Sequence, residues 1–205
     1  MGVLNKIKVK IAKRIDSKVG NFLRSRYQSF NVSRPYNIIV ESNSLLKDKV
    51  AIVTGGSGAI GRACCVRLAS EGAIVYVCGS RKGSASAVVA EIKEMGLKAK
   101  EVVLNVLDAA DIEKTIDAIA EENNGRIDIL VNSAGGSARD KASNIVSQSV
   151  DVIDYILNVN LRGAMLCCRV AGKYMIAQRS GRIINITSVI GQQGKAGFSE
   201  YAASH

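Results

Sequence analysis

The sequence of 205 residues predicts an α/β fold built on a doubly wound parallel sheet, and three observations support this prediction. Short apolar runs alternate with helix-like segments from Lys49 onward. A glycine-rich turn, residues 54–61, joins the first apolar run to the first such segment. Polar residues directly follow several of the apolar runs. This alternation favours parallel strands covered by helices on both faces, with ligands bound at the carboxyl ends of the strands.

The expected elements follow one another regularly along the chain. Gly72 and Gly96 are expected to close the first two helices, and Asp108 to cap the third. Because only five strands are expected where such sheets have six or more, the sheet is predicted to be incomplete at its C-terminal edge, with the last strand exposed. The expected strands are 50–54, 74–78, 99–104, 127–131 and 182–187, and the expected helices are 60–71, 84–95, 109–123 and 149–179, the last after a loop to about 147.

Charge divides the chain into a basic N-terminal extension, residues 1–46, and a domain, residues 47–205. The net charge is +10, and the extension holds five Lys and four Arg against Asp16 and Glu41, a net charge of +7. Apolar residues recur every three or four positions over residues 3–23, which predicts a basic amphipathic helix. Such a helix can make peripheral contact with an anionic membrane, bind a partner, direct the chain to an organelle, or pack on its own domain.

Composition excludes several function classes. Hydrophobic residues make up 47% and charged residues 22%, as in globular proteins, and no apolar stretch approaches the roughly 18 residues of a membrane span. The absence of Trp and the 4% aromatic content argue against nucleic-acid binding. The single histidine, His205, excludes Ser-His-Asp chemistry and a multi-histidine metal site, so no metal is expected.

The five cysteines include two adjacent pairs and no C-x-x-C motif, which is a poor disulfide framework. We therefore expect small buried apolar residues in a reducing compartment, and a cytoplasmic location is the first expectation. Organelle targeting or peripheral membrane attachment through residues 1–46 are the alternatives. The cysteines are Cys64, Cys65, Cys78, Cys167 and Cys168.

The glycine-rich turn has the spacing of a dinucleotide-binding loop, Gly56-x-Gly58-x-x-Gly61. The N-terminus of the following helix offers unpaired N–H groups and about half a positive charge to a pyrophosphate, and glycines let the backbone approach that anion. A glycine turn in an ordinary strand–helix unit is the alternative. The candidate cofactor-binding residues of this loop are Gly55, Ser57, Gly58, Ala59, Ile60 and Gly61.

The end of the second expected strand favours NADP(H) over NAD(H). An NAD site usually carries an acidic residue about 20 residues after the glycine loop, yet no acid occurs between Glu71 and Glu91. Ser80, Arg81 and Lys82 follow the strand instead, and Arg81 or Lys82 can pair with a 2′-phosphate. NAD(H) remains an alternative, and both cations can simply be solvated.

Further motifs follow the glycine loop in a fixed order over residues 47–205. With Ser188 thirteen residues before Tyr201, this order resembles the short-chain dehydrogenase/reductase family, closest to its 3-oxoacyl-(acyl-carrier-protein) reductase type. The motifs are Leu104-Asn105-Val106, Leu130-Val131-Asn132-Ser133-Ala134-Gly135, Asn158-Val159-Asn160, Ile186-Thr187-Ser188 and Tyr201-Ala202-Ala203-Ser204.

The resemblance implies a Rossmann fold, a homo-oligomer, and hydride transfer between a nicotinamide and the carbonyl or alcohol of a small-molecule substrate. Tyr201 matches the general acid/base, and Ser188 matches the residue that hydrogen-bonds the substrate carbonyl. Asn160 matches the residue that holds a relay water at a helix distortion. The matched cofactor contacts are Asn105 and Val106 for adenine, and Asn132, Ala134 and Gly135 in the turn beside the cofactor.

Three positions depart from the family pattern: Ala59 replaces a usual Gly, Ser133 a usual Asn, and His205 a Lys four residues after the tyrosine. The third matters most, since a phenol that exchanges protons near neutral pH needs a cation beside it. Histidine is shorter than lysine and mostly neutral at pH 7. A non-catalytic NAD(P)-binding protein is therefore the alternative to a reductase, and we expect the chain to be truncated relative to the family.

Overall fold

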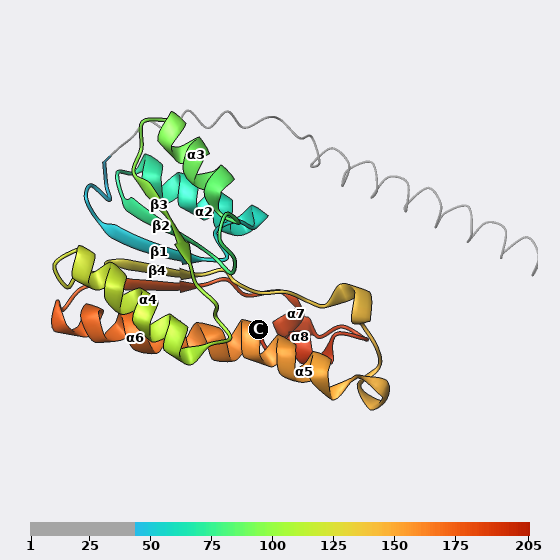
Figure 1. The fold of residues 1–205 in the computed structure, drawn as a ribbon. Helices are drawn as coiled ribbons and strands as arrows, with labels where there is room; N and C mark the ends of the chain where they lie inside the picture. Colours follow the sequence, from blue (N-terminus) through green and yellow to red (C-terminus); the bar gives the residue numbers. More distant parts are fainter. Residues whose placement is uncertain (1–43) are drawn as a thin grey trace, which may run out of the picture. The chain divides into compact units, whose positions relative to one another are not determined.

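The computed structural model describes residues 44–205, in which helices flank a parallel sheet (Figure 1). The predicted amphipathic helix over residues 3–23, and the extension up to residue 43, lie outside the described residues. The division at residue 46 stays a prediction. Within the described part of the chain, no helix combines the length and apolar character needed to cross a membrane.

The sheet has five parallel strands in the order β3-β2-β1-β4-β5, which confirms the predicted fold class. The chain builds outward from β1 to β3, then returns to the other side of β1 for β4 and β5, so the order reverses between β1 and β4. The strands are β1 (Val50–Thr54), β2 (Ile74–Gly79), β3 (Ala99–Val103), β4 (Ile129–Asn132) and β5 (Arg182–Asn185). Their carboxyl ends share one edge, since Thr54 pairs with Asn132 and Asn132 with Asn185.

Two apolar cores lie on the two faces of the sheet because successive side chains of a strand point to opposite faces. In β1, Ala51 and Val53 join the core under α2 (Ala59–Ser70) and α3 (Ser86–Glu94). Val50 and Ile52 join the core under α4 (Ala109–Glu122) and α6 (Gly163–Ala177). Figure 1 shows these helix pairs on opposite sides of the strands. Each fully buried aliphatic side chain contributes about 1.5–3 kcal/mol of transfer free energy.

The prediction of one continuous α-helix over residues 149–179 is wrong, because a π-helical segment interrupts it. This stretch consists of α5 (Val150–Leu157), the π-helical segment η3 (Asn158–Arg162) and α6. The distortion lies at Asn160, where the family resemblance implies one. A Cβ on Gly163 would come 2.8 Å from the Val106 carbonyl oxygen, so this glycine lets the helix pass close to the end of β3.

The other element boundaries agree with the prediction within about two residues. Asp108 caps α4 as expected, accepting hydrogen bonds from Ala110 N at 2.9 Å and Asp111 N at 3.2 Å. Helix α3 begins at Ser86 rather than residue 84 because Ser84 N donates to the Arg81 carbonyl in a turn. The prediction missed α7 (Ile190–Gln193) and the 3₁₀ turns η1 (Arg139–Lys141) and η2 (Ile145–Ser147), while the chain reaches α8 (Ser199–Ala203) at its end.

All five cysteines fall in the described region and are free thiols, as expected. Three of them, Cys65, Cys78 and Cys167, are buried. The expectation of burial is wrong for Cys64 and Cys168, which are only half-buried. Both lie near the exposed strand β5, where, among the described residues, no further strand covers the sheet.

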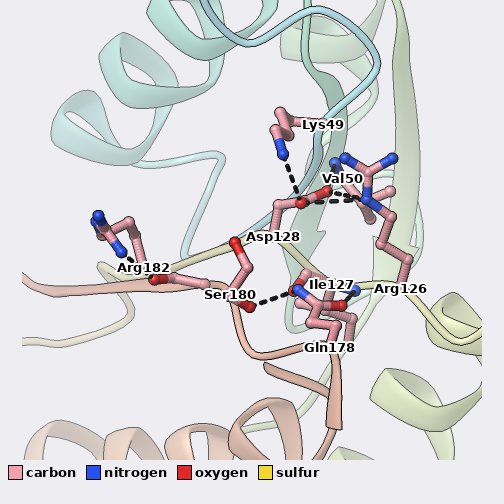
Figure 2. A network of polar contacts seen from close by, with 9 residues as sticks. Lys49, Val50, Arg126, Ile127, Asp128, Gln178, Ser180 and Arg182 are labelled. Carbon is pink, nitrogen blue, oxygen red and sulfur yellow. Dashed lines mark hydrogen bonds and ion pairs between the residues drawn. The ribbon is translucent and has the colours of Figure 1, made fainter. Parts of the chain in front are cut away.

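A buried carboxylate joins β1 to β4 at the amino end of the sheet, opposite the glycine loop (Figure 2). Asp128 accepts a hydrogen bond from Val50 N at 2.8 Å. Its carboxylate also pairs with Lys49 Nζ at 3.2 Å and Arg126 Nε at 2.9 Å. The carboxylate therefore satisfies a buried backbone donor and two cations together.

Gln178 extends this network to the connection between α6 and β5 (Figure 2). Its amide donates to the carbonyl oxygens of Ile127 and Ser180, each at 2.6 Å. Its Oε1 accepts from Ile127 N at 3.3 Å. The amino ends of β4 and β5 are thereby fixed relative to each other, which sets the register of the edge strand.

Candidate active site

The glycine loop folds tightly onto the carboxyl ends of β1, β2 and β4. Gly56 N donates to Cys78 O at 2.9 Å, and Gly58 N donates to Gly55 O at 3.0 Å. Gly55 has a φ of +63°, and a Cβ there would lie 2.7 Å from Ala134 Cα. A Cβ on Gly61 would lie 2.2 Å from the Gly55 oxygen. Both glycines are therefore required by close backbone contact.

The N-terminus of α2 is open to an anion. Its N-cap, Gly58, makes no side-chain capping bond, and no acidic residue occupies the first turn. Residues 57–60 are exposed. The first N–H groups of a helix have no partner within it, so they are available to a phosphate.

Thr54 fixes the turn that follows β4. Its Oγ1 accepts hydrogen bonds from Ser133 N and Ala134 N, both at 3.1 Å. Only the backbone of Ser133 takes part in these bonds, so the replacement of the usual Asn at this position leaves them intact. Asn132 is buried, and its amide donates to Asn185 Oδ1 at 2.8 Å, which joins β4 to β5.

Asn160 ties the same turn to the C-terminal helix. Its Oδ1 accepts from Gly136 N at 2.9 Å, and its Nδ2 donates to Gly136 O at 3.0 Å. The same Nδ2 lies 2.9 Å from Ser204 Oγ and 3.3 Å from His205 Nε2. The π-helical segment places this buried amide between two loops that come from distant parts of the sequence.

Tyr201 and His205 meet edge to face, with ring centroids 4.4 Å apart and an interplanar angle of 66°. Both line a cavity of about 340 Å³ together with residues 58–61 and 133–137. Burial lowers the pKa of the His205 imidazole below its ordinary value of 6.5. The imidazole is therefore neutral at pH 7 and brings no positive charge to the phenol.

A second cavity, of about 460 Å³, adjoins the first and shares Ala134, Ile186, Thr187 and His205 with it. Asn132 and Asn160 line this second cavity. The structure therefore brings ten of the predicted site residues around two adjoining cavities. They are Gly58, Ala59, Ile60, Gly61, Asn132, Ala134, Gly135, Asn160, Tyr201 and His205.

Ser188 is not brought into either of these cavities. It is half-buried, and its Oγ accepts a hydrogen bond from Ile190 N at 3.2 Å in the turn that leads into α7. The preceding residues, Ile186 and Thr187, line both cavities instead. Ser188 is thus next to the site in sequence, and its hydroxyl oxygen accepts a bond within its own turn.

The remaining candidates lie along the same edge of the sheet but outside the two cavities. Ser80 and Arg81 are exposed beyond β2. Beyond β3, Asn105 Oδ1 accepts from Leu107 N at 3.1 Å, and Val106 packs on the core under α4 and α6. Gly55 and Ser57 belong to the glycine loop without lining either cavity.

Sequence reasoning missed Thr54 and Ser204 as residues that position the site. Thr54 is the last residue of β1, directly before the glycines, and its hydroxyl holds the turn after β4. Ser204 lies three residues after Tyr201 and contacts Asn160. Each lies within a recognised motif, which was the available signal, but their partners are 40 or more residues away in sequence.

Comparison with known proteins assigns the family. The family model described as short chain dehydrogenase matches residues 49–205. A 3-oxoacyl-(acyl-carrier-protein) reductase of Thermotoga maritima is 36% identical over 159 residues, covering 78% of this chain and 63% of the relative. One from Aquifex aeolicus is 40% identical over 160 residues, with the same coverage. The chain belongs to the short-chain dehydrogenase family and spans 63% of the length of these relatives.

Solved structures agree with this assignment. A protein described as a short-chain alcohol dehydrogenase, from Sinorhizobium meliloti, superimposes with a TM-score of 0.72 at 31% identity, covering 78% of this chain and 62% of that one. A variant of actinorhodin polyketide ketoreductase, solved with NADPH, gives a TM-score of 0.71 at 30% identity, covering 77% and 59% of the two chains.

Proposed function

We propose that the protein binds NADP(H) along the carboxyl edge of its sheet and transfers hydride between the nicotinamide and a carbonyl or alcohol. The observation that carries this proposal is the cavity of about 340 Å³ lined by the glycine loop, the turn after β4 and Tyr201. One end offers uncapped helix N–H groups for a pyrophosphate, and the other offers a phenol for proton transfer. Membership of the short-chain dehydrogenase family supports the same reading.

The preference for NADP(H) rests on the end of β2. An acid for the ribose hydroxyls is missing there, and Arg81 supplies a cation suited to a 2′-phosphate, beside Ser80. The NADPH in the ketoreductase structure is consistent with this preference. Asn105 and Val106 lie at the carboxyl end of β3, on the side of the switch point where the adenine is expected.

The proton is assigned to Tyr201, whose hydroxyl donates to the oxygen of the carbonyl as it is reduced. Asn160 and Ser204 position the helix that carries Tyr201, through their bond at 2.9 Å. Ser188 is assigned to the substrate carbonyl by family resemblance. Its Oγ accepts from Ile190 N, which leaves the O–H free to donate to that carbonyl. The bound cofactor supplies the hydride.

The substrate class is proposed from the relatives. Two relatives are named 3-oxoacyl-(acyl-carrier-protein) reductases and one solved neighbour a polyketide ketoreductase, so a 3-oxoacyl thioester is the first candidate. Homo-oligomeric assembly and a cytoplasmic location stay predictions.

Binding and turnover test the proposal separately. Calorimetric titration of the full chain is expected to give saturable NADPH binding, tighter than NADH binding. Oxidation of NADPH with 3-oxoacyl thioesters and simple ketones then tests turnover. Tyr201→Phe is expected to lose turnover and retain NADPH binding, since it removes only the hydroxyl. Saturable binding of neither nucleotide contradicts the proposal.

A non-catalytic NAD(P)-binding protein is the second candidate, because His205 is neutral where the family places a lysine. This candidate predicts NADPH binding without turnover across the carbonyl panel. His205→Lys places a cation beside the phenol again. Turnover in this variant, with none in the wild-type chain, would show that His205 is the reason for the missing turnover. His205→Gln is the matched control, which changes the side chain without adding charge.

A further inference from the structure

A carboxylate from β3 holds the start of α3, beside the turn that follows β2. Glu101 Oε1 accepts a hydrogen bond from Ala85 N at 3.1 Å. Glu101 Oε2 accepts from Ser86 Oγ at 2.6 Å. Both oxygens of the carboxylate are thereby engaged by the first residues of α3, and these bonds cross from one element to another.

The turn before α3 folds back onto the end of β2. Ser84 donates to the Arg81 carbonyl oxygen twice, from its N at 3.1 Å and from its Oγ at 2.6 Å. A Cβ on Gly79 would lie 2.1 Å from Ser84 Oγ, so the turn lies directly on the end of the strand. A side chain at residue 79 would therefore displace the Ser84 hydroxyl from its bond to the Arg81 carbonyl oxygen.

This turn carries two exposed cations, Arg81 and Lys82, between two fixed points. At one end, β2 is held in the sheet by pairing with β1 and β3. At the other end, Ala85 is buried and is held by Glu101. The hydrogen bond from Ser86, followed by that from Ala85 N, lowers the pKa of the Glu101 carboxyl, so the carboxylate is charged at neutral pH.

We propose that Glu101 is a positioning residue for recognition of the adenosine 2′-phosphate, because it holds the turn from which Arg81 meets that phosphate. This inference rests on the proposed NADP(H) function and adds the residue on which its selectivity depends. Without Glu101, the backbone N–H of Ala85 loses its acceptor and the second end of the turn is held less firmly, so ordering the turn on binding costs affinity. An arginine whose backbone is held in advance loses less entropy when it forms a bidentate pair with a phosphate.

Electrostatic repulsion predicts the opposite sign. Glu101 is itself an anion on the adenosine side of the sheet, so repulsion of the 2′-phosphate would make its removal strengthen binding. The sign of the effect of removing Glu101 therefore separates positioning from repulsion.

The test uses two fragments of the adenosine end, 2′,5′-ADP and 5′-AMP, titrated calorimetrically against the full chain. Glu101→Ala is expected to weaken 2′,5′-ADP binding about tenfold and to leave 5′-AMP binding within about twofold, a loss of selectivity of about 1.4 kcal/mol. Glu101→Gln is expected to keep most of the selectivity, because its amide oxygen can still accept from Ala85 N. Glu94→Ala removes the same charge from an exposed position on α3 and is expected to change neither affinity.

Ser86→Ala keeps the bond from Ala85 N and removes the one at 2.6 Å, so it is expected to show a smaller loss in the same direction. This variant provides the test should Glu101→Ala fail to fold, as judged by circular dichroism. Unchanged selectivity, equal loss for both ligands, or tighter binding of 2′,5′-ADP in Glu101→Ala or Ser86→Ala overturns the inference. Wild-type protein that binds neither fragment nor NADPH overturns the proposed function instead.

Discussion

At the scale of single residues, the contact between Tyr201 and His205 sets the chemistry open to the site. The phenol is held edge to face against an imidazole that burial keeps neutral. Asn160 contacts both the end of α8, which carries Tyr201, and the turn after β4. The side chains of Tyr201, His205 and Asn160 therefore form one cluster. Of these three side chains, His205 is the one whose charge changes with mild acidification.

The stability of the protein is expected to fall on acidification as His205 becomes protonated. Its pKa is lowered in the folded state, so the unfolded chain binds the proton more readily once the pH drops below about 6.5. The contribution of the neutral ring is complete above this pH and is lost as the pH falls toward the lowered folded-state value. Thermal midpoints of wild type and His205→Gln between pH 8 and pH 5.5 measure this effect.

His205→Gln has no titrating ring, so any stability advantage of wild type over this variant is expected to shrink below about pH 6.5. A difference in midpoint that stays constant over the whole range contradicts the assignment of a lowered pKa. Changes in thermal midpoint that both proteins share come from the titration of carboxylates and do not affect the difference between them.

Much of the candidate site could be predicted at this scale, because motif residues that end strands meet at one edge of a parallel sheet. Residues 58–61, Ala134 and Tyr201 do line one cavity. The position of Ser188 could not be predicted in the same way, since the turn into α7 uses its hydroxyl. The contacts of Thr54 and Ser204 depend on tertiary pairing that no local pattern encodes.

At the scale of elements, the joint between β1 and α2 depends on glycines at particular positions. The usual family Gly is replaced by Ala59, which begins α2 without disturbing the loop bonds of Gly56 and Gly58. Glycine is required at positions 55 and 61 instead, because a Cβ on Gly55 or Gly61 would collide with backbone atoms.

Gly61→Ala is expected to destabilise the fold by about 3 kcal/mol, because its Cβ would lie 2.2 Å from a backbone oxygen that cannot move alone. Gly58→Ala is the matched control. Its Cβ meets only the Gly55 oxygen, at 3.4 Å, and its φ of −75° suits alanine, so a cost of about 1 kcal/mol or less is expected. Urea unfolding measures both, and equal costs contradict the argument.

The joint between β1 and β4 depends on Asp128 in a similar way. Asp128→Ala leaves the buried Val50 N–H without its acceptor, and we expect a loss of about 2 kcal/mol in the free energy of unfolding. Glu113→Ala, which breaks an exposed pair with Lys173 on the surface of α4, is the control and is expected to leave the unfolding midpoint nearly unchanged. Since Asp128 lies at the amino end of the sheet, retained NADPH affinity in Asp128→Ala is part of the prediction.

The helices and strands were largely predictable because apolar runs and glycine stops agree with each other along the chain. The π-helical segment was not visible in the residue pattern, since the apolar periodicity of α5 and α6 continues across it. Helix α3 begins late because the turn from Arg81 to Ser84 and the carboxylate of Glu101 compete for its first residues.

At the scale of the whole molecule, helices cover both faces of the sheet, and within the described residues β5 is an exposed edge strand. The residues of β5 are all exposed, and Ile184 lines an apolar cavity of about 570 Å³ with Ile60 and Leu68 of α2. The exposed edge was predicted from the number of strands. The apolar surface on the α2 side of β5 was not located from sequence, because it depends on the register of β4 with β5.

An exposed apolar edge strand favours association between chains. Ile184→Lys is therefore expected to reduce self-association of the purified protein, measured by sedimentation velocity over a concentration series. Ile176→Lys introduces the same charge at an exposed apolar position on α6 and is the control, expected to have a smaller effect. Equal effects of the two variants attribute the change to net charge and contradict a role for the edge.

The turn that lies on Gly79 affects how mutation can change the coenzyme preference from NADP(H) to NAD(H). A side chain at this position displaces the Ser84 hydroxyl from its bond to the Arg81 carbonyl oxygen, so an acidic replacement of the glycine also loosens the turn. Residue 80 is exposed, and a carboxylate introduced there leaves that bond in place. Residue 80 is therefore the less disruptive starting point for evolution or design of an NAD(H) preference.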